Sequence, residues 1–202
     1  MKKRIGTISV ILGVLLIISA GVLVANNLRE DQAAASYSQT TMTELAEQMP
    51  AVLRLADTSP AETYVQEVSR KHPLSVVTID GYDYVGVIAL PTLGLELPVM
   101  SEWSYPNLKL SVCRYYGEYA GEALVFCAHN YTSHFGRLRE LNIGDEVLFT
   151  DMDGNVYTYV VDELEELTPY AVEEVTAGEW PLTLFTCTVG GRTRVVVRCD
   201  FS

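Results

Sequence analysis

The pattern of hydrophobic and polar positions changes twice along the chain and divides it into three parts. Residues 5–25 form an uncharged run dominated by Ile, Leu, Val, Gly and Ala. At 1.5 Å rise per residue, a helix of this length crosses the ~30 Å hydrocarbon core of a bilayer. Residues 26–78 are mostly polar, whereas residues 79–202 alternate short apolar runs with turn residues. We therefore predict a cytoplasmic tip and transmembrane anchor over residues 1–25, an extracellular stalk with helices over 26–78, and one β-domain over 79–202.

The charges on either side of the apolar run predict its orientation. Residues 2–4 are Lys-Lys-Arg, and Arg29, Glu30 and Asp31 follow the run. Basic residues ahead of the run keep the amino end in the cytoplasm, so we expect a single-pass protein of the cell membrane whose remaining chain is extracellular. A cleaved signal peptide has the same layout. Its apolar core is usually only ~7–15 residues long, so we expect a retained anchor and keep cleavage as the alternative.

Two helices are expected in the stalk. Thr43 is a good capping residue for a first helix with apolar positions between residues 45 and 53, although Pro50 limits its regularity. A second helix is expected over residues 61–71, between Ser59-Pro60 and His72-Pro73. These helices would hold the β-domain away from the membrane.

The last part of the chain predicts a mainly β fold. The pair Asp153-Gly154 is a strong hairpin signal between two apolar runs. Residues 106–116 have no clear pattern and are compatible with a short helix, and a second short helix is expected from Thr168-Pro169 to Val175. The apolar runs that we expect to form strands are 84–90, 95–99, 123–128, 145–149, 156–161, 180–187 and 194–198. About eight closely spaced strands without βαβ alternation predict a closed, eight-stranded, largely antiparallel barrel with a few short helices.

Composition narrows the class of partner and of cofactor. The formal net charge is −12 and the pI is about 4.6, so phosphates would be repelled and no nucleic-acid partner is expected. The four cysteines contain no CxxC spacing, and we expect no metal site and no cofactor. The acidic residues Glu163, Glu165 and Glu166 are read as a solvated edge rather than a calcium site.

Cys187 is the first candidate for chemistry. It ends an apolar run at Thr183-Leu184-Phe185-Thr186-Cys187, and Gly190-Gly191 then turns the chain into a second run that begins at Arg194. A thiol at a strand end, beside a loop, is placed to meet a substrate, although a buried structural cysteine is the alternative. If Cys187 reacts, it must stay free. We expect the other three, Cys113, Cys127 and Cys199, to be buried thiols, with a Cys127–Cys199 bridge as the alternative.

A reactive thiol needs a base and an electrostatic partner. His129 follows the apolar run 123–128 and is the preferred histidine, with His134 as its rival. Arg192, Arg194 and Arg198 share one face of the last strand because side chains alternate along a strand. The alternation of side chains therefore cannot distinguish the three arginines, but Arg194 is the one at which the apolar run begins. We therefore predict a Cys187, His129 and Arg194 site.

The sequence Thr-Leu-Phe-Thr-Cys resembles the TLxTC pattern of sortases, the cysteine transpeptidases of Gram-positive cell surfaces. The His129 and Arg194 runs also fall where that family has its histidine and arginine, and the resemblance covers roughly residues 83–202. It implies a sortase-type barrel and catalytic Cys187, His129 and Arg194. Thr186 matches the family's threonine and is expected to contact substrate at the oxyanion pocket; an ordinary strand residue is the alternative.

The same resemblance implies what such an enzyme would act on. The donor would be an LPXTG-type sorting signal cut after threonine, and the acceptor would be an amine of the peptidoglycan precursor or a pilin lysine. His129-Asn130 and the segment 135–138 look like a class B pattern, yet the segment before Leu182 is short for that class, so the class stays open between B-like and D-like. Two alternatives remain: a thiol peptidase that resolves the acyl-enzyme with water, and a non-catalytic, membrane-tethered peptide-binding module.

Overall fold

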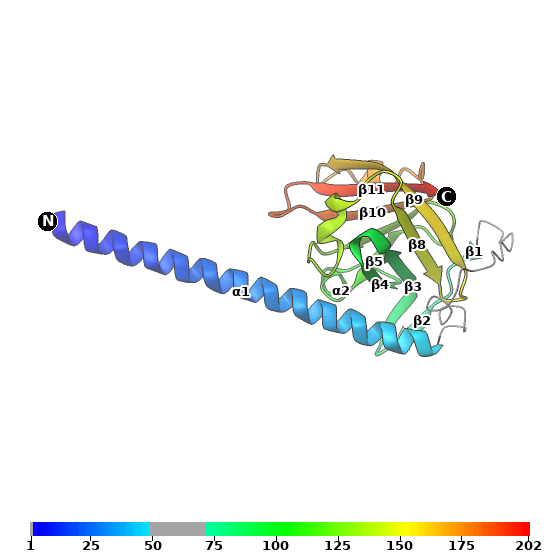
Figure 1. Cartoon of the computed structure of the whole chain (residues 1–202), viewed down its shortest axis with the longest axis horizontal. Helices are drawn as coiled ribbons and strands as arrows, with labels where there is room; N and C mark the ends of the chain where they lie inside the picture. Colours follow the sequence, from blue (N-terminus) through cyan, green and yellow to red (C-terminus); the bar gives the residue numbers. More distant parts are fainter. Residues whose placement is uncertain (1, 49–71) are drawn as a thin grey trace.

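A long helix and a closed barrel make up the protein (Figure 1). The computed structural model describes residues 2–48 and 72–202, with side chains from residues 10 and 73 onward. Helix α1 spans Lys2–Gln48, and its N-terminal half extends away from the barrel, as Figure 1 shows. In the described part of the chain, α1 is the one helix long and apolar enough to cross a membrane, judged by length and composition.

The barrel closes with eight strands. Their order is β3-β4-β5-β7-β10-β11-β9-β8, and β8 pairs back onto β3. Neighbouring strands are antiparallel except for β4–β5 and β7–β10, which are parallel. This result confirms the predicted mainly β, eight-stranded barrel. The strands are β3 (Tyr82–Leu90), β4 (Leu95–Met100), β5 (Val112–Tyr116), β7 (Leu124–Ala128), β8 (Glu146–Asp151), β9 (Val156–Leu167), β10 (Leu182–Cys187) and β11 (Arg194–Phe201).

Short elements decorate the barrel. Strand β2 (Val77–Ile79) extends the sheet beside β3, and β1 (His72–Pro73) pairs with β6 (Tyr119–Ala120). The segment 106–116 contains only the end of a one-turn helix, α2 (Tyr105–Leu108), before it enters β5. Ser104 caps α2, because its hydroxyl accepts a hydrogen bond from the backbone N–H of Asn107. The remaining short helices are η2 (Pro91–Leu93), η3 (Phe135–Glu140) and α3 (Val172–Val175), which begins later than predicted.

Alternation along the strands separates an inner and an outer layer. Inside the barrel, Phe126 and Phe149 pack with 5.0 Å between ring centres and are fully buried. On the outer face of β7 and β11, Val125 and Val196 pack under Val175 of α3. Burying both faces of these strands fixes their register, because a slip of one residue would exchange the two sets.

Helix α1 lies against the barrel with its C-terminal half. Ala34, Ser38, Thr41 and Leu45 are buried, and their spacing places them on one face of the helix. The predicted cap at Thr43 is wrong: the helix runs through this residue without a break, and the Thr43 hydroxyl donates to the carbonyl of Gln39 one turn earlier. The predicted limit between anchor and stalk near residue 25 falls inside this continuous helix. The predicted helix over residues 61–71 lies outside the described residues.

Candidate active site

Strand pairing brings the predicted site residues to one place. Strand β10 pairs antiparallel with β11, and Cys187 stands directly opposite Arg194. Strand β10 also pairs in parallel with β7, in the register Phe185 with Cys127 and Thr186 with Ala128. His129 is the residue after Ala128, at the same end of the sheet as Cys187. Cys187 and His129 therefore lie side by side at the ends of two neighbouring parallel strands.

Cys187 and His129 continue the outer face of the barrel wall. Phe185 and its partner Cys127 belong to outer clusters, whereas Leu184 and Phe126 belong to the barrel interior. Because strand side chains alternate, the next outward position on β10 is Cys187, and the position after Ala128 on β7 is also outward. Arg194, which stands opposite Cys187 in an antiparallel pair, lies on the same face.

A groove of about 200 Å³ runs over this face. Cys187 and Arg194 line it at one end, and Trp103 and Tyr115 line it at the other. Tyr115 packs edge-on against Phe185, with 5.2 Å between ring centres, which makes the floor apolar. The other residues along its walls are Tyr105, Leu108, Cys127, Ala128, Thr168, Pro169, Ala171, Val172, Val175 and Thr186. This narrow, mostly apolar groove fits an extended peptide that presents one carbonyl to the thiol.

The three candidate arginines of the last strand have different surroundings. The half-buried Arg194 guanidinium donates weakly to the carbonyls of Thr193 and Gly191, at 3.2 and 3.4 Å, and lines the groove. Arg192 is exposed in the turn before β11. Arg198 is buried and forms an ion pair with Glu165 at 2.7 Å. Of these arginines, Arg194 is the one that lines the groove beside the thiol.

Arg198 has a structural environment. Its guanidinium also donates to the carbonyls of Glu174 and Val175 and to the hydroxyl of Thr183, at 2.8 to 3.4 Å. These hydrogen bonds connect α3 and β10 to β11 and use the N–H donors of the Arg198 guanidinium. Arg198 is therefore committed to holding α3 against the barrel.

His129 is held by an aromatic neighbour. Its ring stacks on Tyr131, with 3.9 Å between centres and 21° between planes. Its Nδ1 atom is buried and has no hydrogen-bond partner among the described residues. Burial, and then the positive charge of Lys109, lower the pKa of His129 below its ordinary value, while Glu30 opposes this shift. The imidazole is therefore mostly neutral at neutral pH.

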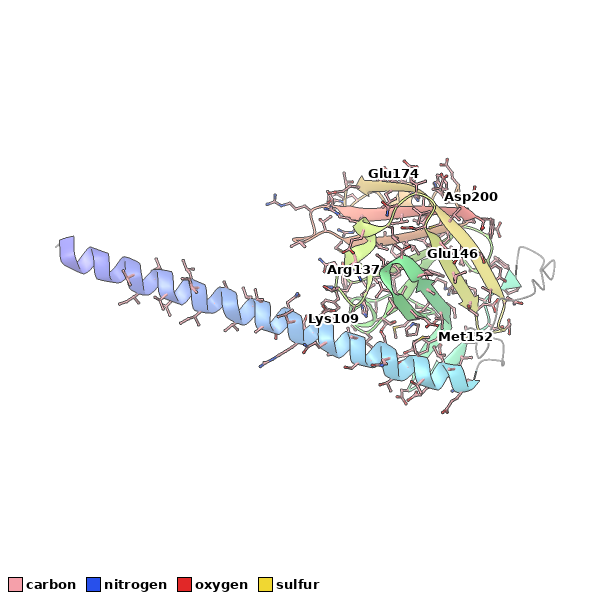
Figure 2. The ribbon with its side chains drawn as sticks, in the orientation of Figure 1. Lys109, Arg137, Glu146, Met152, Glu174 and Asp200 are labelled. Carbon is pink, nitrogen blue, oxygen red and sulfur yellow. The ribbon has the colours of Figure 1, made fainter. Side chains whose placement is uncertain are left out.

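The loop after His129 is fastened to α1. The Tyr131 hydroxyl donates to Glu30 Oε2 at 2.9 Å, and the Ser133 backbone N–H donates to Asp31 Oδ1 at 3.0 Å. The Ser133 hydroxyl also bonds Asp31. Lys109 lies 3.7 Å from Glu30, beside α1 in Figure 2. Sequence reasoning missed these contacts, because Glu30 and Tyr131 lie in separate parts of the chain and each is an ordinary polar residue by itself.

His134, the rival histidine, is fully buried. Burial, and then the charge of His129, lower its pKa to about 4, so it is neutral at neutral pH. Its ring lies 5.6 Å from that of Tyr131. Neither histidine is among the residues that line the groove, but His129 is partly exposed and directly follows Ala128, which does line it. The structure thus places His134 beneath the loop that carries His129, and not on the surface that holds Cys187.

Thr186 joins the two site strands. It is buried, and its hydroxyl donates to the carbonyl of Ala128 at 2.9 Å. Its side-chain proton is therefore engaged by the backbone immediately before His129. Thr186 also forms part of the groove wall.

Four thiols are present and all are free, so the alternative Cys127–Cys199 bridge is not formed. Cys113, Cys127 and Cys199 are buried as expected, whereas Cys187 is partly exposed. Burial raises the pKa of Cys113 and of Cys199 to about 12. Burial, and then the nearby thiols Cys113 and Cys187, raise the pKa of Cys127 well above its ordinary value. Only Cys187 combines access with a place in the groove.

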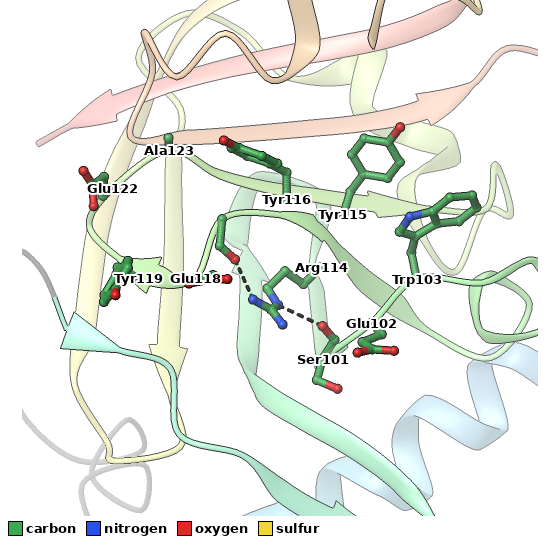
Figure 3. Close-up of a pocket in the computed structure, with 11 residues that line it drawn as sticks. Ser101, Glu102, Trp103, Arg114, Tyr115, Tyr116, Glu118, Tyr119, Glu122 and Ala123 are labelled. Carbon is green, nitrogen blue, oxygen red and sulfur yellow. Dashed lines mark hydrogen bonds between the residues drawn. The ribbon is translucent and has the colours of Figure 1, made fainter. Parts of the chain in front are cut away.

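A larger pocket of about 620 Å³ adjoins the groove (Figure 3). The two share Trp103 and Tyr115, so the pocket continues the groove away from Cys187. Glu102, Glu118 and Glu122 stand around it, and Arg114 is bonded to the carbonyls of Ser101 and Gly117 at 2.8 and 2.6 Å. The sequence did not predict this pocket, because the hydrophobic pattern of residues 106–116 did not show where α2 ends and β5 begins.

Two carboxylates of the acidic edge, Glu165 and Glu166, are ion-paired. Glu165 pairs with Arg198, and Glu166 pairs with Arg139 at 2.6 Å and with the hydroxyl of Thr193. Within residues 2–48 and 72–202, no group of three His, Cys, Asp or Glu side chains is arranged to hold a metal ion.

Comparisons with known proteins agree with the fold. Residues 88–202 match the family described as Sortase domain. A comparison with curated proteins finds no match. Among solved structures, sortase C1 from Streptococcus agalactiae is 25% identical, with a TM-score of 0.54, over 62% of this chain and 70% of that one.

Two further solved structures share the fold. Sortase C from Streptococcus pneumoniae is 22% identical, with a TM-score of 0.54, over 79% of this chain and 89% of that one. A Clostridium perfringens sortase D5 transpeptidase is 16% identical, with a TM-score of 0.53, over 59% of this chain and 79% of that one. At these identities the likeness establishes the barrel alone. The match to the sortase domain, however, covers more than half of the sequence, and the chain therefore belongs to the sortase family of transpeptidases.

Proposed function

We propose that this sortase cleaves an LPXTG-type sorting signal through a thioacyl-enzyme on Cys187 and transfers the surface protein to a cell-wall amine. The observation that carries the proposal is the direct pairing of Cys187 with Arg194 on the outer face of the barrel, with His129 directly after the end of the neighbouring strand β7. The sortase-domain match supports the reaction type, and the apolar groove supports a peptide substrate.

In the first step, the Cys187 thiolate attacks the carbonyl carbon of the threonine in the signal. Negative charge develops on the carbonyl oxygen, and the Arg194 guanidinium, which is always protonated, stabilises it or holds the substrate backbone. The C–N bond then breaks. The imidazolium of His129 gives its proton to the departing amine, which leaves a thioester on Cys187 and a neutral His129.

In the second step, an acceptor amine attacks the thioester carbon. His129 takes a proton from the amine, the C–S bond breaks, and Cys187 returns as a thiolate with the imidazolium restored. Because Nδ1 of His129 is buried, we assign both proton transfers to Nε2. The acceptor is an amine of the peptidoglycan precursor. A pilin lysine is the other candidate, and the S. pneumoniae neighbour is described with reference to pilin substrate specificity.

The active form requires a charged His129 beside a deprotonated Cys187. The lowered pKa of His129 makes that pair a minority form at neutral pH, as the family resemblance implies. The minority form is sufficient, because the rate depends on its population multiplied by its reactivity. Thr186 supports the site by tying β10 to β7 through Ala128, and its backbone borders the groove where the oxyanion would form.

The N-terminal part of α1 is proposed to anchor the enzyme as a single membrane span. Its described apolar side chains are exposed, which would be unfavourable in water and is favourable in lipid. The basic residues 2–4 place the amino end in the cytoplasm and the barrel outside the cell.

The test uses the complete protein in detergent and a fluorogenic LPXTG-type peptide library, with and without triglycine. We expect cleavage after threonine and, with triglycine, a ligated product whose mass shows the new amide bond. Cys187→Ala and His129→Ala should each remove turnover. Unchanged activity in Cys187→Ala would refute the proposed nucleophile.

The same experiment separates the alternatives. If the rate and the products of cleavage are the same with and without triglycine, the protein is a thiol peptidase that resolves the acyl-enzyme with water. Peptide binding without cleavage, and without labelling of Cys187 by a peptide vinyl sulfone, would identify a membrane-tethered binding module.

A further inference from the structure

The end of the barrel that carries Cys187 points in the same direction as the N-terminal half of α1. Strand β11 starts at Arg194 and runs roughly alongside the helix, so the β10–β11 turn, residues 188–193, projects toward the apolar half of α1 (Figure 1). Contacts along the helix agree. Glu30 accepts a hydrogen bond from Tyr131, which stacks on His129, so the loop that carries His129 meets α1 just after its apolar half.

The position of the contacts along α1 fixes the height of the site. The large apolar side chains of the helix are exposed from Val10 to Leu28, and the first contacts with the barrel are made by Glu30 and Asp31. Glu30 is two positions after Leu28 along the helix, a rise of about 3 Å. The loop that carries Tyr131, and His129 stacked on it, therefore meet α1 about one and a half helical turns after Ala25, where the uncharged run ends.

The β10–β11 turn has the side chains of a membrane-surface element. Val189 is 94% exposed at its tip, and Arg192 is exposed beside it. The turn is closed by backbone bonds from Gly191 to Thr188 and from Thr188 to Thr193, at 2.8 and 3.0 Å, so Val189 is held outward.

An exposed aromatic side chain stands at the same end. Tyr170 follows β9, whose last residue, Leu167, pairs with Arg194, and Tyr170 is 89% exposed. Tyrosine at the headgroup level, with an apolar tip and an arginine that reaches phosphates, is the composition of an interfacial surface.

We propose that the β10–β11 turn rests on the outer surface of the membrane that α1 spans, so that the groove beside Cys187 opens at the lipid headgroups. Val189 enters the boundary between headgroups and acyl chains, and Arg192 contacts lipid phosphates. The proposal depends on the anchoring by α1 proposed above. Because the net charge of −12 repels an anionic surface, the helix, and not general attraction, sets this orientation.

The consequence concerns substrate delivery. A sorting signal or an amine carried on a lipid can reach Cys187 without leaving the membrane surface. The larger pocket lined by Glu102 and Glu118 continues the groove away from Cys187 and leaves room for the rest of the donor chain. The end of the groove beside Cys187, which faces the membrane in this proposal, therefore holds the scissile bond and the acceptor amine.

The test measures depth directly with the complete protein in phosphatidylcholine vesicles whose acyl chains are brominated near the headgroup. Tryptophan is introduced by Val189→Trp, and the signal of the two native tryptophans is subtracted. Val156→Trp is the matched control, because Val156 is also exposed but begins β9 at the opposite end of the barrel. We expect quenching of the new tryptophan at 189 and none at 156.

Each outcome decides a separate point. Equal quenching at positions 189 and 156 would overturn the proposed orientation. Release of the protein by carbonate would overturn the anchoring and the orientation with it. The quenching should be the same in a Cys187→Ala background, so a failure of the proposed reaction leaves this result unchanged.

A kinetic measurement adds a functional reading. Val189→Asp should lower turnover of a donor peptide tethered to the vesicle by roughly fivefold, because a charge replaces an apolar contact with lipid. Turnover of the same peptide free in solution should stay unchanged, because Val189 lies outside the groove. Equal loss on both substrates would contradict the proposal.

Discussion

Tyr131 lies flat against His129 and, through its hydroxyl, donates a hydrogen bond of 2.9 Å to Glu30 of α1. One side chain thus connects the proposed general acid–base to the helix that carries the proposed membrane-spanning stretch. The hydrogen bond from Tyr131, followed by the charge of Lys109, lowers the pKa of Glu30, which keeps this carboxylate ionised as an acceptor. The orientation of His129 therefore depends on a residue outside the barrel.

The first prediction concerns Tyr131 as a positioning residue. Tyr131→Leu removes the ring that His129 stacks on, and we expect kcat on an LPXTG-type peptide to fall by roughly tenfold, because catalysis is sensitive to small displacements of the acid–base. Tyr131→Phe keeps the stack and loses only the bond to Glu30, so its loss should be clearly smaller. Thermal unfolding followed by circular dichroism is the control for stability. Equal losses of kcat in the two variants would contradict a role for the stack.

The second prediction concerns the pKa of His129. Glu30 favours the imidazolium and Lys109 opposes it, so Glu30→Gln should lower the pKa of His129 further and Lys109→Met should raise it. NMR titration of the ring Cε1–H measures both. Because the active pair is the minority form, the pKa of His129 sets the acid limb of the pH–rate profile, and that limb should move with it. Shifts in the same direction for both variants would refute this electrostatic assignment.

The third prediction concerns selective reactivity of the thiols. Burial raises the pKa of Cys113 and of Cys199 to about 12 and holds that of Cys127 well above its ordinary value, whereas Cys187 is partly exposed. A methanethiosulfonate reagent should therefore add to one site in the folded protein and to four in urea, as intact mass will show. Cys187→Ala should remove the single addition. A second fast adduct in the folded protein would show that another thiol is accessible.

The part of the site closest in sequence could be predicted because a short turn fixes it. Gly190 and Gly191 both adopt positive φ, and they return the chain so that Arg194 meets Cys187 across an antiparallel pair. The position of His129 beside Cys187 could not be predicted from the residues around it in the sequence. It depends on the parallel pairing of β7 with β10, which more than fifty intervening residues separate, and the family resemblance supplied it.

The errors have physical causes as well. Thr43 carries a local capping signal, but propagation of an existing helix is favourable and its hydroxyl bonds within the helix instead. The small buried residues Ala34, Ser38 and Thr41 were the available sign that α1 docks, because they share one face at helical spacing. Contacts such as that between Glu30 and Tyr131 depend on how the elements pack, which no local pattern contains.

The last prediction separates Arg194 from Arg198, which share one face of β11 and were equivalent by pattern. Arg198→Met removes the partner of Glu165 and leaves the carbonyls of Glu174 and Val175 without their donor. Breaking a buried ion pair typically costs 3–5 kcal/mol, and because Glu165 is partly exposed we expect about 2–3 kcal/mol of unfolding free energy to be lost.

Arg194→Met should have the opposite profile. Its guanidinium makes only weak hydrogen bonds to carbonyls of the adjacent turn. The unfolding free energy measured in urea should therefore change by less than about 0.5 kcal/mol, as for most substitutions at surface sites. Its kcat/KM should fall by about a hundredfold, the loss typical when one oxyanion donor is removed. Arg194→Lys should recover only part of this activity, because an ammonium cannot reproduce the planar fork. If Arg198→Met instead lost activity while keeping its unfolding free energy, the catalytic arginine would have to be reassigned.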